Sequence, residues 1–217
     1  MLRAGIVEHE LISQEMKKLQ KMRIDNSIKD TLILVEHPEI VTVGPRAIND
    51  GIIVPEKYEK ATIDRGGGIT WHGPGQLVAY PIFHWDFENE KNVSRIINII
   101  EQWIINSLRP LGIKSVRDDR MQGAWYSGQK ISSVGLQFLK WVSRHGFTIN
   151  YNTPSNRVEQ LSCCGLEEGV TTSLNKLGKD GLTREVIEGM LISMAPKSIN
   201  RIASEIRLLE DLPPCNI

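Results

Sequence analysis

Apolar side chains recur at helical spacing in four segments of the chain. Residues 10–24 carry an apolar stripe with lysines on the opposite side, and residues 93–108 carry a wider apolar face that ends before a proline and a glycine. Apolar positions three and four residues apart are typical of an amphipathic helix. Residues 183–194, with Thr183 as a suitable N-cap, and residues 199–209 are predicted as two further helices.

Shorter apolar runs predict strands. They lie at residues 31–35, 40–43, 77–83, 125–126, 130–136 and 147–151. The first two runs, which Pro38 separates, predict a hairpin near a central sheet. This order of elements favours an α+β fold with a mixed, largely antiparallel central sheet flanked by helices. At 217 residues, we expect a single domain spanning residues 1–217.

Charge and composition exclude several classes of function. Lys and Arg total 26 and Asp and Glu total 26, so the balanced charge gives no support for broad attraction to nucleic acid or a membrane. No apolar stretch has the length of a signal peptide or a membrane span, and the three cysteines form no disulfide framework. We therefore expect a cytoplasmic protein. A basic cluster, Lys17, Lys18, Lys21 and Arg23, is either a solvated helix face or a landing surface for an acidic partner.

The segment most indicative of chemistry is residues 65–76, Arg-Gly-Gly-Gly-Ile-Thr-Trp-His-Gly-Pro-Gly-Gln. Successive glycines weaken packing, and they are used where something approaches the backbone closely. Bare peptide of this kind can line a cleft for a straight acyl chain or a flat ligand, with His72 pointing into it. A glycine-rich hairpin with a satisfied histidine is the alternative. The pattern is neither a phosphate-binding loop nor a dinucleotide fingerprint.

Three further segments carry reactive side chains. Lys130 begins a strand rich in small residues, His145 and Gly146 stand at the head of another strand, and Cys164 is followed by a glycine. Taken singly, each has an ordinary explanation: a solvated lysine, a turn histidine and a small buried thiol. Neither Cys-x-x-Cys nor a close histidine pair occurs, so we expect no metal site.

Together these segments resemble the lipoyl(octanoyl) transferase family. The family pattern is matched in order at residues 65–76, 130–135 and 145–150, and less completely at residues 163–165; the resemblance covers about residues 30–175. It implies the fold shared by biotin and lipoate protein ligases. It also implies transfer of an octanoyl group from an acyl carrier protein thioester, through a cysteine thioester intermediate, to a lysine of a lipoyl domain.

The resemblance implies roles for individual residues. Cys164 takes the position of the nucleophile, and Lys130 that of the lysine that lowers the pKa of the thiol and exchanges protons. His145 and Asn150 take supporting positions. The implied substrate-binding residues are Arg65, Gly66, Gly67, Gly68, Ile69, Thr70, Trp71, His72, Ser133, Val134, Gly135, Gly146, Phe147 and Thr148.

The same resemblance implies partners. The donor is octanoyl-acyl carrier protein, and the acceptors are lipoyl domains of 2-oxoacid dehydrogenase complexes and the glycine cleavage H protein. It implies no cofactor, no nucleic acid, no membrane and a monomer.

Three positions depart from the family pattern. Cys163 replaces a proline and raises the question of which thiol reacts; Val134 replaces an isoleucine; and Thr148 replaces a smaller residue, which would narrow an acyl channel. Two alternatives stay open: an ATP-dependent lipoate or biotin protein ligase, and a non-catalytic module that binds lipoyl domains.

Overall fold

The computed structural model describes residues 1–87, 90–161 and 166–209. The helices are α1 (His9–Ile24), α2 (Pro45–Asn49), α3 (Val93–Leu108) and α4 (Arg184–Ile199), with short 3-10 helices at Arg109–Leu111 and Leu174–Leu177. The strands are β1 (Leu2–Ile6), β2 (Thr31–Glu36), β3 (Ile40–Val43), β4 (Lys60–Thr62), β5 (Ile69–His72), β6 (Gln76–Ile82), β7 (Trp125–Tyr126), β8 (Gln129–Lys130), β9 (Ser132–Leu139), β10 (Val142–Asn150) and β11 (Arg207–Leu208).

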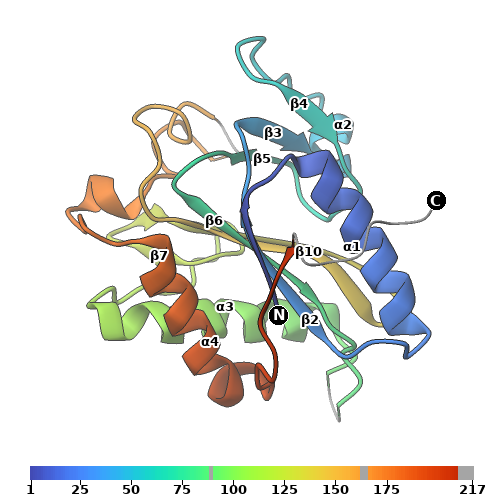
Figure 1. Ribbon diagram of the computed structural model, residues 1–217. Coiled ribbons are helices and arrows are strands. Elements are labelled where there is room, and N and C mark those ends of the chain that lie inside the picture. The colour runs from blue at the N-terminus through green and yellow to red at the C-terminus, as the bar shows by residue number, and fades with distance from the viewer. Residues whose placement is uncertain (88–89, 162–165, 210–217) are drawn as a thin grey trace.

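The main sheet has the strand order β11-β1-β2-β6-β10-β9. β1 runs parallel to both of its neighbours, whereas the pairs β2–β6, β6–β10 and β10–β9 are antiparallel. This arrangement confirms the predicted mixed, largely antiparallel sheet. A smaller sheet, with the order β4-β3-β5, lies at one end of the molecule (Figure 1).

Helices cover both faces of the main sheet because its central strands are apolar on both sides. Along β6, Leu77 and Ala79 enter a core with α3 and α4, whereas Val78 and Tyr80 enter a second core with α1. α1 lies on one side of the sheet in Figure 1, and α3 and α4 lie on the other. The alternation of strand side chains therefore divides the interior into two layers.

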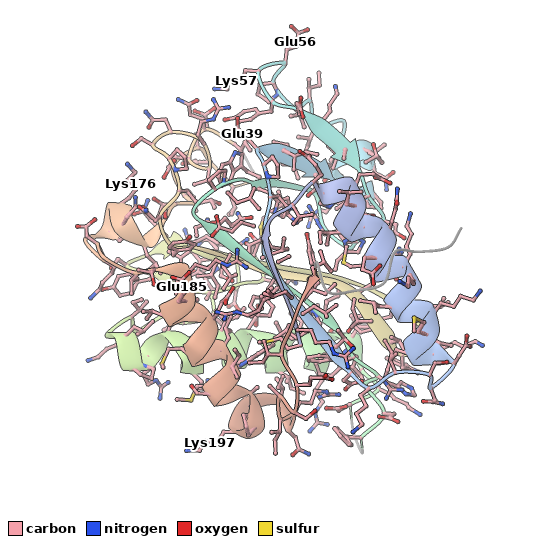
Figure 2. All side chains as sticks on the ribbon, in the orientation of Figure 1. Glu39, Glu56, Lys57, Lys176, Glu185 and Lys197 are labelled. Carbon is pink, nitrogen blue, oxygen red and sulfur yellow. The ribbon has the colours of Figure 1, made fainter. Side chains whose placement is uncertain are left out.

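A third, smaller core lies beneath the β4-β3-β5 sheet. It gathers Val41, Ile69 and Trp71 from the sheet with Val158 and Leu161 from the segment after β10. Figure 2 shows Glu39 and Lys57 at this end of the molecule, and Lys197 at the opposite end on α4. The small sheet is thus an element with its own packing that stands over the α1 side of the main sheet.

Two predicted elements are wrong. Residues 31–35 and 40–43 form strands but no hairpin, because β2 pairs with β6 and β1, whereas β3 pairs with β4 and β5. The helix predicted over residues 199–209 does not form. α4 ends at Ile199, its C-cap Asn200 has a left-handed φ of 51°, and β11 then pairs in parallel with β1. The other predicted helices form, and Thr183 caps α4 as expected through a bond from the Val186 amide.

Within the described part of the chain, no helix has both the length and the apolar character needed to cross a membrane.

A tight turn joins β7 and β8. Ser127 and Gly128 both have positive φ values, 52° and 77°. Two consecutive left-handed residues suit a two-residue hairpin turn, because their twist matches that of the strands.

Candidate active site

Lys130 is held in a buried position at the end of β8. Its side chain is only 2% exposed. The Lys130 amide donates to the carbonyl of Val170 at 2.8 Å, and its carbonyl accepts from the amide of Thr172 at 2.9 Å. Its ammonium donates to the hydroxyl of Ser133. Lysines are seldom fully buried, so this one is not the solvated charge that its isolated position in the sequence allows.

A cleft of about 370 Å³ of empty space lies between the small sheet and strands β6, β9 and β10. Its walls include these residues of the predicted site: Arg65, Thr70, His72, Ser133, Val134, Gly135, His145, Gly146, Phe147 and Thr148. The remaining walls come from His9, Ile63, Val78 and Tyr80. Segments far apart in sequence therefore meet at one cavity, as the resemblance implies.

A second cavity adjoins the cleft and reaches Lys130. It is lined by Lys130 together with Gly66, Gly67, Gly68 and Ile69. Arg65, Thr70, Ser133 and Val134 line both cavities, so the two share a wall. We describe the two together as the slot, with Lys130 at its proximal end and Tyr80 and His72 in its distal part.

Arg65 fixes the glycine-rich loop to the small sheet. Its guanidinium donates to the hydroxyl of Thr70 at 2.7 Å, to the hydroxyl of Thr42 at 3.0 Å and to the carbonyl of Gly66 at 3.1 Å. The Gly66 amide in turn donates to the carbonyl of Leu136 in β9 at 3.0 Å. The loop therefore bridges the small sheet and the main sheet, and it forms a fixed wall of the slot.

The glycines of the site differ in how much space surrounds them. A Cβ at Gly146 would lie 1.9 Å from the carbonyl oxygen of Ala79, and one at Gly135 would lie 3.0 Å from the Cδ of Arg65. The close approach of Ala79 requires a glycine at position 146, whereas a Cβ at position 135 would make a tight contact that a small shift of Arg65 and Gly66 could relieve. At Gly66 the nearest atom would be 3.5 Å away, an ordinary contact, so the protein itself leaves room for a side chain there. Bare backbone at Gly66 is consistent with a surface reserved for a ligand.

A network of hydrogen bonds defines the protonation of His72. The amide nitrogen of Gln76 donates to the carbonyl of Trp71 and to Oδ1 of Asn150, both at 2.8 Å. Its oxygen Oε1 therefore faces Nδ1 of His72, at 2.8 Å, and accepts from it. Nε2 of His72 is then the acceptor, with the hydroxyl of Thr42 at 3.2 Å. Burial lowers the pKa of His72 well below its usual range, so the ring is neutral.

His9 and Tyr80 also line the distal part of the slot, and His37 lies behind them in contact with both. The rings of His9, His37 and His72 have centroids 5.3, 5.7 and 6.1 Å apart. Nδ1 of His37 donates to the carbonyl of Val7 at 2.6 Å, and its Nε2 accepts from the hydroxyl of Tyr80 at 2.8 Å. Burial lowers the pKa of His37 to about 4 and also lowers the pKa of His9. The cluster is therefore uncharged at neutral pH.

Sequence reasoning did not assign His9, His37 or Tyr80 to the site. His9 stands at the start of a helix, His37 in a connection and Tyr80 within a strand. The alternation along β6 places Tyr80 on the same face as Val78, and this is a usable signal for Tyr80. No local pattern gives the two histidines a role in the site, because only the tertiary structure brings their segments together.

His145 is held in an unusual backbone conformation. Its φ is 61°, a left-handed value that is rare for any residue other than glycine, and rarer still within a strand. Its Nε2 donates to Oδ1 of Asp64 at 2.9 Å, and Arg144 donates to the other oxygen of the same carboxylate. Burial lowers the pKa of His145 to about 4, although the bond to Asp64 opposes this shift. The ring is thus a neutral, oriented wall of the cleft.

Three predicted residues serve the site through other contacts. The ring of Trp71 is buried in the small core and donates to Glu39 at 2.8 Å, and Trp71 lines neither cavity of the slot. The ring of Phe147 packs against Trp103 on the opposite face of the sheet, with centroids 5.3 Å apart. Asn150 links Gln76 to the carbonyl of Thr172 at 2.9 Å. Trp71 and Asn150 thus support the slot without lining it, whereas Phe147 both lines the cleft and packs its ring against Trp103.

Thr148 lies on the wall of the cleft. Its hydroxyl oxygen accepts from the amide of Ser133 at 3.2 Å, which ties β10 to β9 beside the cavity.

Cys163 and Cys164 lie outside the described residues. Among the described residues, no three His, Cys, Asp or Glu side chains gather as a metal ion would require.

Solved structures with the same fold include a lipoate protein ligase and a biotin protein ligase. A T. acidophilum protein described as a lipoate protein ligase, with bound lipoic acid, superposes with a TM-score of 0.68 over 97% of this chain and 89% of that chain, at 13% identity. The biotin protein ligase of Aquifex aeolicus gives a TM-score of 0.53 over 92% of this chain and 67% of that chain, at 11% identity. The chain therefore shares the fold of these lipoate and biotin protein ligases.

The sequence comparisons narrow this class to one family. Residues 14–194 match the model of the lipoyl protein ligase A/B catalytic domain, and the chain belongs to this family. The octanoyltransferase of Caldicellulosiruptor saccharolyticus is 35% identical over 180 residues, 79% of this chain and 76% of that protein. The octanoyltransferase of Syntrophobacter fumaroxidans is 34% identical over 193 residues, 86% of this chain and 84% of that protein.

Proposed function

We propose that this chain is an octanoyltransferase: an acyltransferase that moves an octanoyl group from an acyl carrier protein thioester to a lysine of a lipoyl domain. The observation that carries the proposal is the slot, with a buried lysine at its proximal end and residues of all the described matching segments on its walls. Relatives named octanoyltransferase, 34–35% identical over most of the chain, support it.

The reaction proceeds through two acyl transfers. The thiolate of Cys164 attacks the thioester carbonyl, a bond from the Cys164 sulfur to the acyl carbon forms, and the bond to the carrier sulfur breaks. Lys130 gives a proton to the departing carrier thiolate. The lysine amine of the acceptor then attacks the acyl-enzyme, an amide bond forms, the Cys164 sulfur leaves, and the proton of the amine passes to Lys130.

The slot suits this substrate class. Ile63, Val78 and Val134 offer apolar contacts to methylenes, and the imidazoles in the distal part are neutral. Each buried methylene contributes about 0.8 kcal/mol to binding. Lys130 stands at the end where the thioester carbonyl would lie, and the side chain of Ser133 orients its ammonium.

The test is formation of the acyl-enzyme without ATP. Wild-type protein is incubated with octanoyl-acyl carrier protein, and intact mass spectrometry is expected to record a gain of one octanoyl group. Cys164→Ser is expected to gain nothing, whereas Cys163→Ser, the matched control at the neighbouring thiol, is expected to gain the group normally.

The alternatives predict other outcomes of the same experiment. An ATP-dependent ligase would modify a lipoyl domain from free octanoate and ATP, and Cys164→Ser would retain that activity. A non-catalytic binding module would show neither acyl-enzyme nor product. Acylation of Cys163 in place of Cys164 would overturn the assignment of the nucleophile while preserving the reaction class.

A further inference from the structure

A groove lies beyond the distal end of the slot. It runs between the first turns of α1 and the elements α2 and β4, and it has about 990 Å³ of empty space. Its lining is mixed: Ser13, Lys17 and Asn49 are polar, whereas Pro45 and Ile48 are apolar. It is thus a second open space on the α1 side of the molecule.

The groove and the slot share a thin wall. His9, Ile63 and His145 line both the groove and the cleft. None of the three lines the cavity that contains Lys130. The spaces therefore follow one another in the order Lys130 cavity, cleft, shared wall and groove. We call the side chains of His9, Ile63 and His145 the partition.

The members of the partition are held in different ways. His145 is fixed by its bond to Asp64, which Arg144 also holds. The backbone of Ile63 donates to the carbonyl of Val43 at 3.0 Å. The ring of His9 stacks on His72 and contacts His37, and within the described chain its side chain makes no hydrogen bond. Removing the His9 ring therefore opens the partition without breaking a hydrogen-bond network.

We propose that the partition of His9, Ile63 and His145 stops the methyl end of the acyl chain and so sets the chain length that the enzyme accepts. The inference rests on the proposed function, because it takes Lys130 as the end of the slot where the carbonyl lies. An octanoyl chain extends from that end toward the partition. A longer acyl chain meets the three side chains of the partition, which block its passage into the groove.

The test compares acyl donors of two lengths. The kcat/KM values for octanoyl- and dodecanoyl-acyl carrier protein are measured for the wild type and for His9→Ala. The wild type is expected to favour octanoyl. His9→Ala is expected to raise the dodecanoyl-to-octanoyl ratio by about tenfold or more, because each additional buried methylene is worth roughly fourfold.

Two more variants complete the experiment. Ile48→Ala changes a residue that lines only the groove, and its ratio is expected to equal that of the wild type. Ile63→Ala removes a second member of the partition and serves where His9→Ala does not fold; its ratio is expected to rise in the same direction.

The two hypotheses fail differently. Unchanged ratios in His9→Ala and Ile63→Ala, with octanoyl transfer intact, would overturn the partition. Absence of octanoyl transfer in the wild type would instead overturn the proposed function.

Discussion

At the scale of single residues, the site depends on side chains whose setting differs from what their types suggest. Lysine is usually solvated and histidine is usually able to gain a proton near pH 6.5. Here Lys130 is buried against Ser133, and His37 and His145 are held neutral by burial. Perturbed groups of this kind gather at functional sites. The chemistry of the slot therefore comes from the environment of these residues as much as from their identity.

Replacement of Lys130 tests that environment directly. Lys130→Met keeps a flexible apolar stem of similar length and removes the ammonium, so the fold is expected to persist. Single-turnover octanoyl transfer is expected to fall by roughly 10²–10⁴-fold, the usual contribution of a proton-transferring group. Lys130→Arg keeps the positive charge but exchanges no proton. If Lys130→Met retained wild-type rates, Lys130 would have no part in the reaction.

At the scale of elements, close packing of strands explains glycines that the sequence alone assigns to a ligand. Gly146 lies in β10 where the backbone of β6 leaves no space for a Cβ, because the Ala79 oxygen would be 1.9 Å away. Pro81 Cδ would lie at 2.6 Å from the same Cβ. The glycine therefore permits the pairing of two central strands, and its position beside the cleft follows from that pairing.

Two matched substitutions separate these constraints. Gly146→Ala is expected to lower the free energy of unfolding by about 1–3 kcal/mol, as overpacking does. Gly66→Ala, where the nearest atom would be 3.5 Å away, is expected to leave stability nearly unchanged. Urea denaturation gives both values. Equal destabilisation of the two variants would contradict the assignment of Gly146 to strand packing.

The elements also show which parts of the fold the sequence predicts. α1 and α3 carry helical periodicity and β6 is a continuous apolar run, so their positions follow from pattern alone. β1 pairs with β11, so residues about 200 positions apart in sequence lie side by side. No local sequence pattern predicts this pairing. The hairpin predicted from residues 31–43 was wrong because β2 and β3, although adjacent in sequence, belong to different sheets. The local pattern does not show which strands pair.

The site was predictable to a similar extent. Arg65, His72 and Ser133 follow from the motifs and line the slot, whereas His9 and His37 come from elements that only the tertiary structure brings together.

At the scale of the whole molecule, the slot lies where two sheets and α1 meet, and buried neutral histidines cluster there. Burial lowers the pKa of His37 and of His145 to about 4, and it also lowers the pKa of His9 and His72. In the unfolded chain these histidines take up protons near pH 6.5. The junction of the layers thus links global stability to pH.

The sign of this dependence follows from linkage. Above pH 6.5 the histidines are neutral in both states. Between pH 6.5 and about 4 the unfolded state binds protons that the folded state excludes, so the free energy of unfolding falls as the pH falls. Each such histidine contributes a slope of up to about 1.4 kcal/mol per pH unit. Asp64, whose lowered pKa lies below this window, adds its effect only at lower pH.

Urea denaturation at pH 7 and pH 5 measures the slope. His37→Gln removes one titrating ring and is expected to reduce the loss of stability between the two pH values by about 1–2 kcal/mol. Tyr80→Phe removes the same hydrogen bond, from the Tyr80 hydroxyl to Nε2 of His37, but keeps the imidazole. It is therefore expected to lower stability at both pH values and to retain a greater pH dependence than His37→Gln. An undiminished pH dependence in His37→Gln would show that the His37 ring is already protonated in the folded protein at pH 5.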